Sequence, residues 1–221
     1  MRRDLAYRRV IAHQAEGLGA GGWAAAEVPA RPELTLPAAE ADCLRAEYQR
    51  AGCILEYGSG GSTVLGAEMA GKTLISVESD RAWHGAMTRY FAAHPPRAKL
   101  VLHHADIGPT GDWGHPKSEA QFRRWPGYPL SVLDRPDFTQ PDLVLIDGRF
   151  RAACFLACLF RTRAPLRVLW DDYAGRDRYH EVETFCVPTR MVGRMAVFDL
   201  DPTALPVDRL QQILSVFLRP L

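Results

Sequence analysis

The sequence lacks an excess of charge of either sign. Its 221 residues include 27 lysines and arginines against 26 aspartates and glutamates, which leaves a formal net charge of +1. Proteins that bind nucleic acid or an anionic membrane surface through electrostatics usually carry a basic patch or stripe. We therefore expect no nucleic-acid partner and no membrane partner, and we expect a small molecule as the substrate. A homo-oligomer is compatible with the sequence, which does not specify one.

Long apolar runs and a regular set of cysteines are also missing. No segment approaches the ~18 consecutive apolar residues of a membrane span, and no apolar core of a signal peptide follows Met1–Asp4. The five cysteines are an odd number without regular spacing, which argues against a disulfide framework. Cys154 and Cys158 lie in one apolar run and are expected to be core thiols. These absences favour a reduced, cytoplasmic location.

Two common catalytic signatures are absent as well. The chain has neither a Gly-x-Ser-x-Gly elbow nor a Cys-x-x-Cys pair, which are typical of α/β-hydrolases and of redox or zinc sites. What the chain does have is a regular alternation of short apolar segments with amphipathic ones. This alternation is typical of a parallel sheet covered by helices on both faces.

The alternation predicts one α/β domain with additions. We expect strands at 53–57, 73–78, 99–103, 142–146 and 166–170, helices at 37–50, 64–71, 81–93 and 151–162, two extended segments within 184–200, and a C-terminal helix. Residues 1–36 are predicted to be an N-terminal helical arm, with a helix at 4–16, and residues 37–221 the domain. Residues 107–141 form a long insertion, which suggests a functional segment.

A glycine-rich loop, Glu56–Thr63, lies between the first strand and the next helix. Ligands of open α/β sheets bind beyond the carboxyl ends of the strands. A dinucleotide site needs Gly-x-Gly-x-x-Gly, but Thr63 stands at the third glycine position. Glu78, 20 residues after Gly58, suits a ribose hydroxyl for either kind of ligand. A carboxylate at Glu56 would repel a pyrophosphate and suits a cationic ammonium or sulfonium group.

Residues 53–63 resemble motif I of the class I S-adenosylmethionine (SAM)-dependent methyltransferases, with Ser62 in place of the usual third glycine. Residues 76–80 resemble the second motif, whose acid holds the ribose, and residues 104–107 the third, whose acid meets the adenine amine. The resemblance covers about residues 37–200 and implies a Rossmann-like methyltransferase fold with a mostly parallel seven-stranded sheet. The cofactor-binding residues that it implies are Glu56, Gly58, Ser59, Gly60, Ser62, Thr63, Glu78, Ser79, Asp106, Ile107 and Asp147.

Three carboxylates follow the fourth and fifth predicted strands. Asp147 ends the fourth, and Asp171 and Asp172 end the fifth. Since the ends of neighbouring parallel strands meet, these groups are expected to converge, and like charges so close raise one another's pKa unless a cation lies among them. Oxygen ligands suit Mg²⁺, Mn²⁺ or Ca²⁺. The alternative is that Asp171 and Asp172 cap the next helix or pair with Arg176 and Arg178.

This arrangement resembles the metal-dependent O-methyltransferases of the catechol and macrocin types. The resemblance implies that Asp147, Asp171 and Asp172 hold Mg²⁺. The lysine base of the catechol type is missing, because residues 149–151 are Arg-Phe-Arg and arginine stays protonated. The base is then a histidine, His180 or His115, or the metal alone acidifies the hydroxyl. The predicted catalytic residues are Asp147, Arg149 and His180, where Arg149 binds an acidic substrate group or pairs with a neighbouring carboxylate.

Three functions remain open from the sequence. The first is metal-assisted O-methylation of a small hydroxylated molecule, and the second is a SAM-binding methyltransferase-like protein without metal chemistry. The third, a nicotinamide oxidoreductase, is disfavoured by Glu56 and Thr63. The insertion either covers the site and shapes substrate choice, or packs onto the sheet edge. Its rings are Trp113, His115, Phe122, Trp125 and Tyr128.

Overall fold

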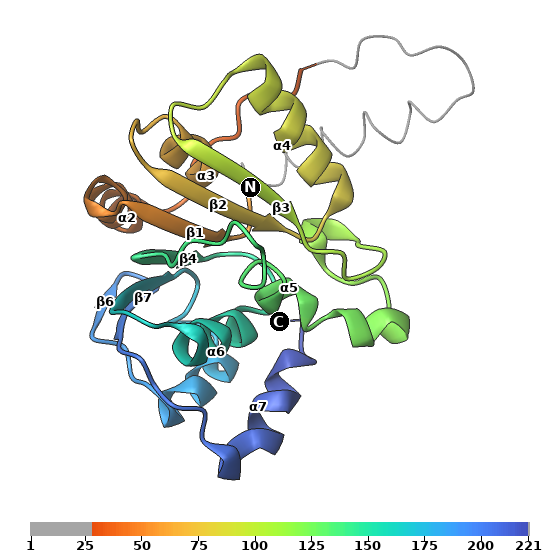
Figure 1. The fold of residues 1–221 in the computed structure, drawn as a ribbon, viewed down its shortest axis with the longest axis vertical. Helices are drawn as coiled ribbons and strands as arrows, with labels where there is room; N and C mark the ends of the chain where they lie inside the picture. The colour runs from red at the N-terminus through yellow and green to blue at the C-terminus, as the bar shows by residue number, and fades with distance from the viewer. Residues whose placement is uncertain (1–27, 221) are drawn as a thin grey trace.

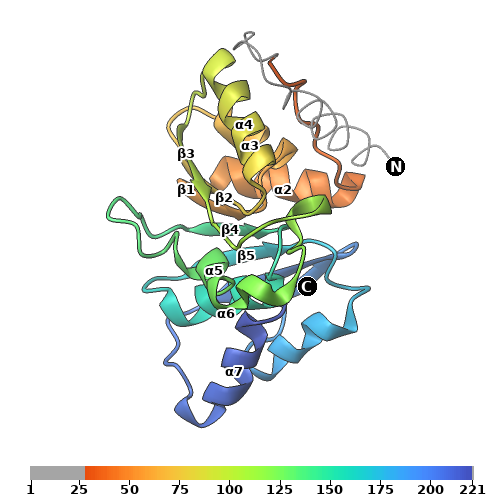
Figure 2. The ribbon, with the colours of Figure 1, turned by 90° about the vertical axis from the view of Figure 1, so that its right-hand side faces the viewer.

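The computed structural model of the chain describes residues 28–220. The helix predicted at 4–16 lies outside the described residues. A seven-stranded sheet has the order β3-β2-β1-β4-β5-β7-β6. Figures 1 and 2 show this sheet running through the middle of the molecule. Its strands are β1 (Cys53–Tyr57), β2 (Thr73–Glu78), β3 (Lys99–His104), β4 (Leu143–Ile146), β5 (Leu166–Trp170), β6 (Arg190–Val192) and β7 (Met195–Leu200). The first five are parallel, while β7 runs antiparallel to both β5 and β6. The predicted seven-stranded Rossmann-like fold is confirmed.

Helices cover both faces of the sheet (Figures 1 and 2). The helices are α2 (Ala38–Arg50), α3 (Gly61–Ala67), α4 (Arg81–Ala93), α5 (Gly127–Leu130), α6 (Arg151–Arg161) and α7 (Leu210–Phe217), with short 3₁₀ turns η1 (Asp112–Gly114), η2 (Glu119–Arg124), η3 (Asp177–Thr184) and η4 (Val207–Arg209). Within residues 28–220, none of these helices is both long and apolar enough to cross a bilayer.

Alternating side chains of the buried strands build two separate cores. Ile54 joins the core beneath α2, α3 and α4, and the next residue, Leu55, joins the core beneath α5, α6 and α7. This follows from the two-residue period of a strand. The strands are therefore buried on both faces, as expected for a parallel sheet between two helical layers.

The chain order creates a switch point at the centre of the sheet. From β1 the chain proceeds outward through β2 to β3, and then returns to β4 on the other side of β1. Connections therefore leave the carboxyl ends of β1 and β4 in opposite directions, which opens a crevice there. The predicted helix at 64–71 begins earlier, at Gly61, because the Thr63 hydroxyl accepts a hydrogen bond from Gly60 N–H (2.9 Å) and closes the first turn.

Candidate functional site

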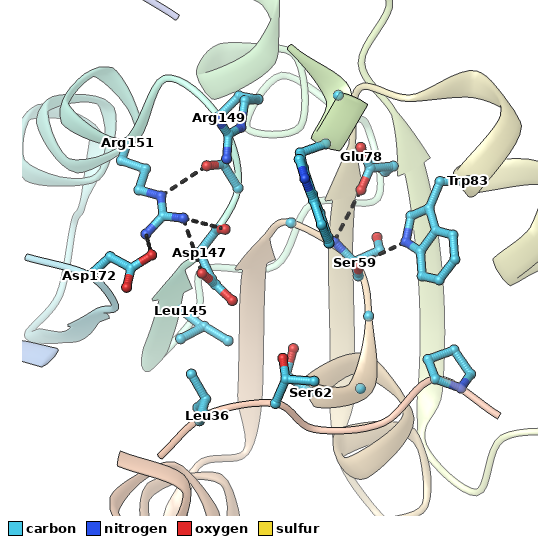
Figure 3. A pocket seen from close by; sticks show the side chains of 18 of the residues that line it. Leu36, Ser59, Ser62, Glu78, Trp83, Leu145, Asp147, Arg149, Arg151 and Asp172 are labelled. Atoms are coloured by element: carbon cyan, nitrogen blue, oxygen red, sulfur yellow. Dashed lines mark hydrogen bonds and ion pairs between the residues drawn. The ribbon is translucent and has the colours of Figure 1, made fainter. Parts of the chain in front are cut away.

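A cavity of about 440 Å³ lies at this crevice. One side is the glycine-loop wall, formed by Gly58–Ser62 and Glu78. The other is the strand-end wall, which consists of the lining residues Asp147, Gly148, Arg149, Arg151, Asp172 and Arg176 together with the adjoining ion pair of Asp171 and Arg194. Figure 3 shows Ser59, Glu78 and Trp83 across the pocket from the aspartates and arginines. The glycine-loop wall follows β1 and β2, and the strand-end wall follows β4 and β5. The fold therefore places a glycine-rich loop opposite a cluster of aspartates and arginines.

The glycine loop needs its first glycine. Gly58 has φ +105°, a left-handed conformation that L side chains rarely adopt. A Cβ at this position would also lie 2.8 Å from the backbone of Gly148. The loop after β1 thus packs directly against the loop after β4, and the two cavity walls are joined at that point.

The carboxyl group of Glu56 supports the loop from below. It accepts hydrogen bonds from the hydroxyls of Tyr48 (2.5 Å) and Thr63 (2.7 Å) and is fully buried. Burial raises its pKa, although the hydroxyl donors oppose this shift. Glu56 does not line the cavity. The predicted contact of its carboxylate with a cationic ligand is therefore not supported by this arrangement and stays a prediction. Its place below the loop requires a side-chain direction that the sequence does not reveal.

Glu78 does line the cavity. Its Oε1 accepts hydrogen bonds from Ser79 N–H (2.7 Å) and Asp80 N–H (2.8 Å), and its Oε2 accepts a long one from Ser59 N–H (3.4 Å). Burial raises the pKa of Glu78 to about 7 in spite of these donors. The carboxyl is therefore held rigidly, and Oε2 retains capacity for a further donor such as a ligand hydroxyl.

The other predicted cofactor residues fall into three groups. Ser59, Gly60 and Ser62 line the cavity with Gly58. Thr63, Ser79 and Ile107 are buried behind its wall, whereas Asp106 accepts hydrogen bonds from Gly108 N–H and Arg124 (both 2.9 Å). The contact of Asp106 with an adenine amine therefore stays a prediction.

An extended segment that we call the strap, residues 28–36, covers the glycine loop. Pro32–Leu36 line the cavity, and an ion pair between Arg31 and Glu68 ties the strap to the end of α3. A Cβ at Gly61 would lie 2.2 Å from the backbone of Glu33. Only a glycine allows this close approach, which sequence reasoning could not foresee because it joins distant parts of the chain.

The insertion contributes to the cavity at two places. Trp113, Gly114 and Tyr128 line it, and the Gly114 carbonyl accepts a hydrogen bond from the Ser79 hydroxyl (3.1 Å). Trp125 instead is buried in the core, while the exposed Phe122 and the ring of His115 are not part of the lining. The insertion therefore lines part of the cavity and also packs into the core, while its covering of the site and its part in substrate choice stay predictions.

The three predicted carboxylates do converge. Asp147, Asp171 and Asp172 each offer an oxygen within 4.8 Å of the others. Arginines, however, already pair with them. Arg194 holds both oxygens of the buried Asp171 (3.0 and 2.7 Å) and lies 3.0 Å from Asp172. Figure 3 shows Arg151 between Asp147 (3.1 Å) and Asp172 (3.7 Å).

The comparisons with known proteins agree with this architecture. A methyltransferase-like protein (spo2022) from Silicibacter pomeroyi DSS-3 is 49% identical, with a TM-score of 0.83 over 86% of this chain and 99% of that one. The chain belongs to the class I SAM-dependent methyltransferase family. The O-methyltransferase TomG from Streptomyces achromogenes, involved in tomaymycin synthesis and solved with SAM, shares the fold at 18% identity (TM-score 0.52, 92% of this chain, 100% of that one). No protein-family model and no curated protein matches the sequence.

Within this methyltransferase, the acidic cluster does not fit a divalent ion as it stands. Mg²⁺ needs oxygen ligands that are not committed to other cations. Both oxygens of Asp171 are held by Arg194, and Asp172 also pairs with Arg176 (3.3 Å). The guanidinium groups therefore supply the positive charge for which the sequence predicts a metal ion. Burial still raises the pKa of Asp171, although Arg194 lowers it.

Arg151 and Arg194 are the functional-site residues that sequence reasoning missed. Arg151 is buried and donates to the carbonyls of Gly148 (2.9 Å), Asp171 (2.6 Å) and Asp147 (2.9 Å). A cation in the first turn of a helix is unfavourable for the helix dipole, and this was the signal that could have drawn attention to it. Arg194 comes from the distant β6–β7 turn and left no such signal.

The remaining catalytic predictions have different outcomes. Arg149 lines the cavity of the methyltransferase, and burial together with the nearby Arg151 lowers its pKa. His180 is not among the lining residues and packs against Tyr173 with 4.9 Å between ring centroids. Its role as a base, like that of His115, stays a prediction that this arrangement does not support.

Proposed function

We propose that this chain transfers the methyl group of SAM to a hydroxyl oxygen of a small molecule within the cavity. The observation that carries the proposal is the placement of Glu78. Its rigid carboxylate, with one oxygen able to accept from a hydroxyl, lies beside the glycine loop of a methyltransferase fold. Such a group suits the ribose of the cofactor, and the acceptor then lies toward the strand-end wall.

The reaction requires no oxidant or reductant. The oxygen–methyl bond forms as the sulfur–methyl bond breaks, so that the sulfonium becomes a neutral thioether and the acceptor loses its hydroxyl proton. Asp147 lines the cavity with its side chain 15% exposed, and its carboxylate is the group that we assign to accept this proton. Trp113 and Tyr128 belong to the cavity lining, and we assign their rings the role of keeping water away from the reacting centre once cofactor and acceptor are bound.

A metal-assisted form of the reaction is the second candidate. The approach of three carboxylates to within 4.8 Å favours it, and the ion pairs with Arg151, Arg176 and Arg194 oppose it. We assign no step to a metal, because every carboxylate of the cluster already has a guanidinium partner.

Calorimetry with SAM, S-adenosylhomocysteine and NAD tests the proposal. We expect SAM and S-adenosylhomocysteine to bind and NAD not to bind. In a separate assay with SAM that carries a labelled methyl group, we expect transfer of the label to members of a panel of hydroxylated small molecules. The matched variant Asp147→Asn should keep the affinity for S-adenosylhomocysteine and lose most of the transfer rate. Binding of NAD in place of SAM would contradict the proposal.

A further inference from the structure

The arginines of the strand-end wall differ in one respect. Arg151, Arg176 and Arg194 each form an ion pair with an aspartate of the cluster. Arg149 forms none with any residue in 28–220, and its buried Nε has no hydrogen-bond partner among them. It nevertheless lines the cavity, beside Arg151 and Asp147 in Figure 3. A half-buried guanidinium without a counter-ion is costly unless a ligand supplies one.

The charge balance of the wall makes the same point. Among residues 28–220, four guanidinium groups lie at this wall against three carboxylates, which leaves one positive charge, and Arg149 is the guanidinium without an ion pair. A wall that binds a divalent cation would instead have more carboxylates than guanidinium groups. The buried hydroxyl of Tyr179, which lies near enough to Arg149 to influence its pKa, also lacks a hydrogen-bond partner among the described residues.

We propose that the methyl acceptor is a hydroxylated acid, whose carboxylate or phosphate group forms an ion pair with Arg149. This inference rests on the proposed function and names the substrate class for it. The planar fork of a guanidinium matches two oxygens of a carboxylate or phosphate. Fixing the acid at one end of the acceptor restricts how its hydroxyl can approach the cofactor, which is how an enzyme gains rate from orientation.

The test uses the full-length protein saturated with S-adenosylhomocysteine. Calorimetry compares pairs of molecules that differ by one anionic group, namely 4-hydroxybenzoate with phenol and glycerol 3-phosphate with glycerol. We expect the anionic member of at least one pair to bind at least about tenfold more tightly, on the scale of a charge-assisted hydrogen bond. Arg149→Gln should abolish this preference and leave the affinity for S-adenosylhomocysteine within about twofold.

Arg178→Gln is the matched control, because Arg178 is exposed and does not line the cavity. It should change neither affinity. The inference is overturned if neither anion binds better than its neutral partner, or if Arg149→Gln retains the preference. It is also overturned if Arg149→Gln weakens S-adenosylhomocysteine instead, since Arg149 would then bind the carboxylate of the cofactor. Failure of wild-type protein to bind S-adenosylhomocysteine would contradict the proposed function itself.

Discussion

The two walls of the cavity stabilise their buried carboxyl groups in different ways. In and behind the glycine-loop wall, Glu56 and Glu78 have hydroxyl and backbone N–H donors, and burial raises the pKa of each. In the strand-end wall, Asp147, Asp171 and Asp172 have guanidinium partners. The first wall leaves a carboxyl able to respond to a ligand, whereas each carboxylate of the second wall already has a counter-ion before any ligand binds.

This difference separates two tasks. A cofactor with a cationic sulfonium and ribose hydroxyls benefits from an acid that has no cation beside it. On the acceptor side the aspartates, including the proposed proton acceptor Asp147, are paired with arginines, and a buried pair of this kind contributes geometry more than net stability. The four predictions that follow test the comparison, beginning with the largest expected effect.

Replacing Arg151 should damage the strand-end wall most. Arg151→Met keeps much of the volume but leaves Asp147 without its ion pair and three carbonyl groups without their donor. Breaking a buried charge pair in this way costs about 3–5 kcal/mol of unfolding free energy. Urea denaturation measures it, with the exposed Arg178→Met as the control. A loss below about 1 kcal/mol would show that the pairing is not structural.

Glu78→Gln should act on ligand binding and not on the fold. The amide keeps the shape but loses the charged acceptor, so we expect SAM affinity to fall by about 1–3 kcal/mol, or roughly 5–150-fold. Stability should not decrease, because burial disfavours the ionised carboxyl that is removed. Titration calorimetry decides, and unchanged affinity would exclude Glu78 as a ribose ligand.

The raised pKa of Glu78, about 7 against an ordinary 4.5, gives opposite pH effects on stability and binding. Between pH 4.5 and pH 7, Glu78 is protonated in the folded protein and ionised in the unfolded chain. The contribution of Glu78 to the free energy of unfolding therefore falls as the pH rises from about 4.5 through 7. SAM affinity should instead rise over pH 6–8, up to about tenfold per unit below the pKa, as the carboxylate forms. Calorimetry of Glu78→Gln across this range should show a flat profile, and a slope like that of the wild type would exclude Glu78 as the titrating group.

The parts of the fold that the sequence predicted correctly are those marked by local patterns of apolar residues and turn residues. The bounds of β2, α4 and β5 agree at both ends with the predicted segments, because each is a continuous apolar or amphipathic run that ends at a turn signal. Pro95, for example, follows α4 closely. The strand ends in turn located the carboxylates of the site, since parallel strands end at one edge.

The parts that were missed depend on contacts between distant residues. Arg194 meets Asp171 across 23 positions, and Glu33 of the strap packs on Gly61. Neither contact follows from periodicity or composition, because each depends on how a turn or an extended segment is placed by the finished fold. The sequence therefore predicted where the acids gather but not which cations neutralise them.

The smallest expected effect is on metal binding by the wild-type protein. It tests directly whether arginines, and not a metal ion, neutralise the carboxylates of the strand-end wall. Because Arg194 occupies both oxygens of Asp171, wild-type protein should show no saturable Mn²⁺ binding below ~1 mM, the weak end of protein oxygen sites. Electron paramagnetic resonance of free Mn²⁺ measures this with S-adenosylhomocysteine present. Arg194→Met should gain measurable binding, since Asp171 loses its counter-ion while Asp147 and Asp172 stay close. Tighter binding by the wild type than by Arg194→Met would show that the arginines yield to a metal, and the metal-assisted reaction would then replace the one proposed.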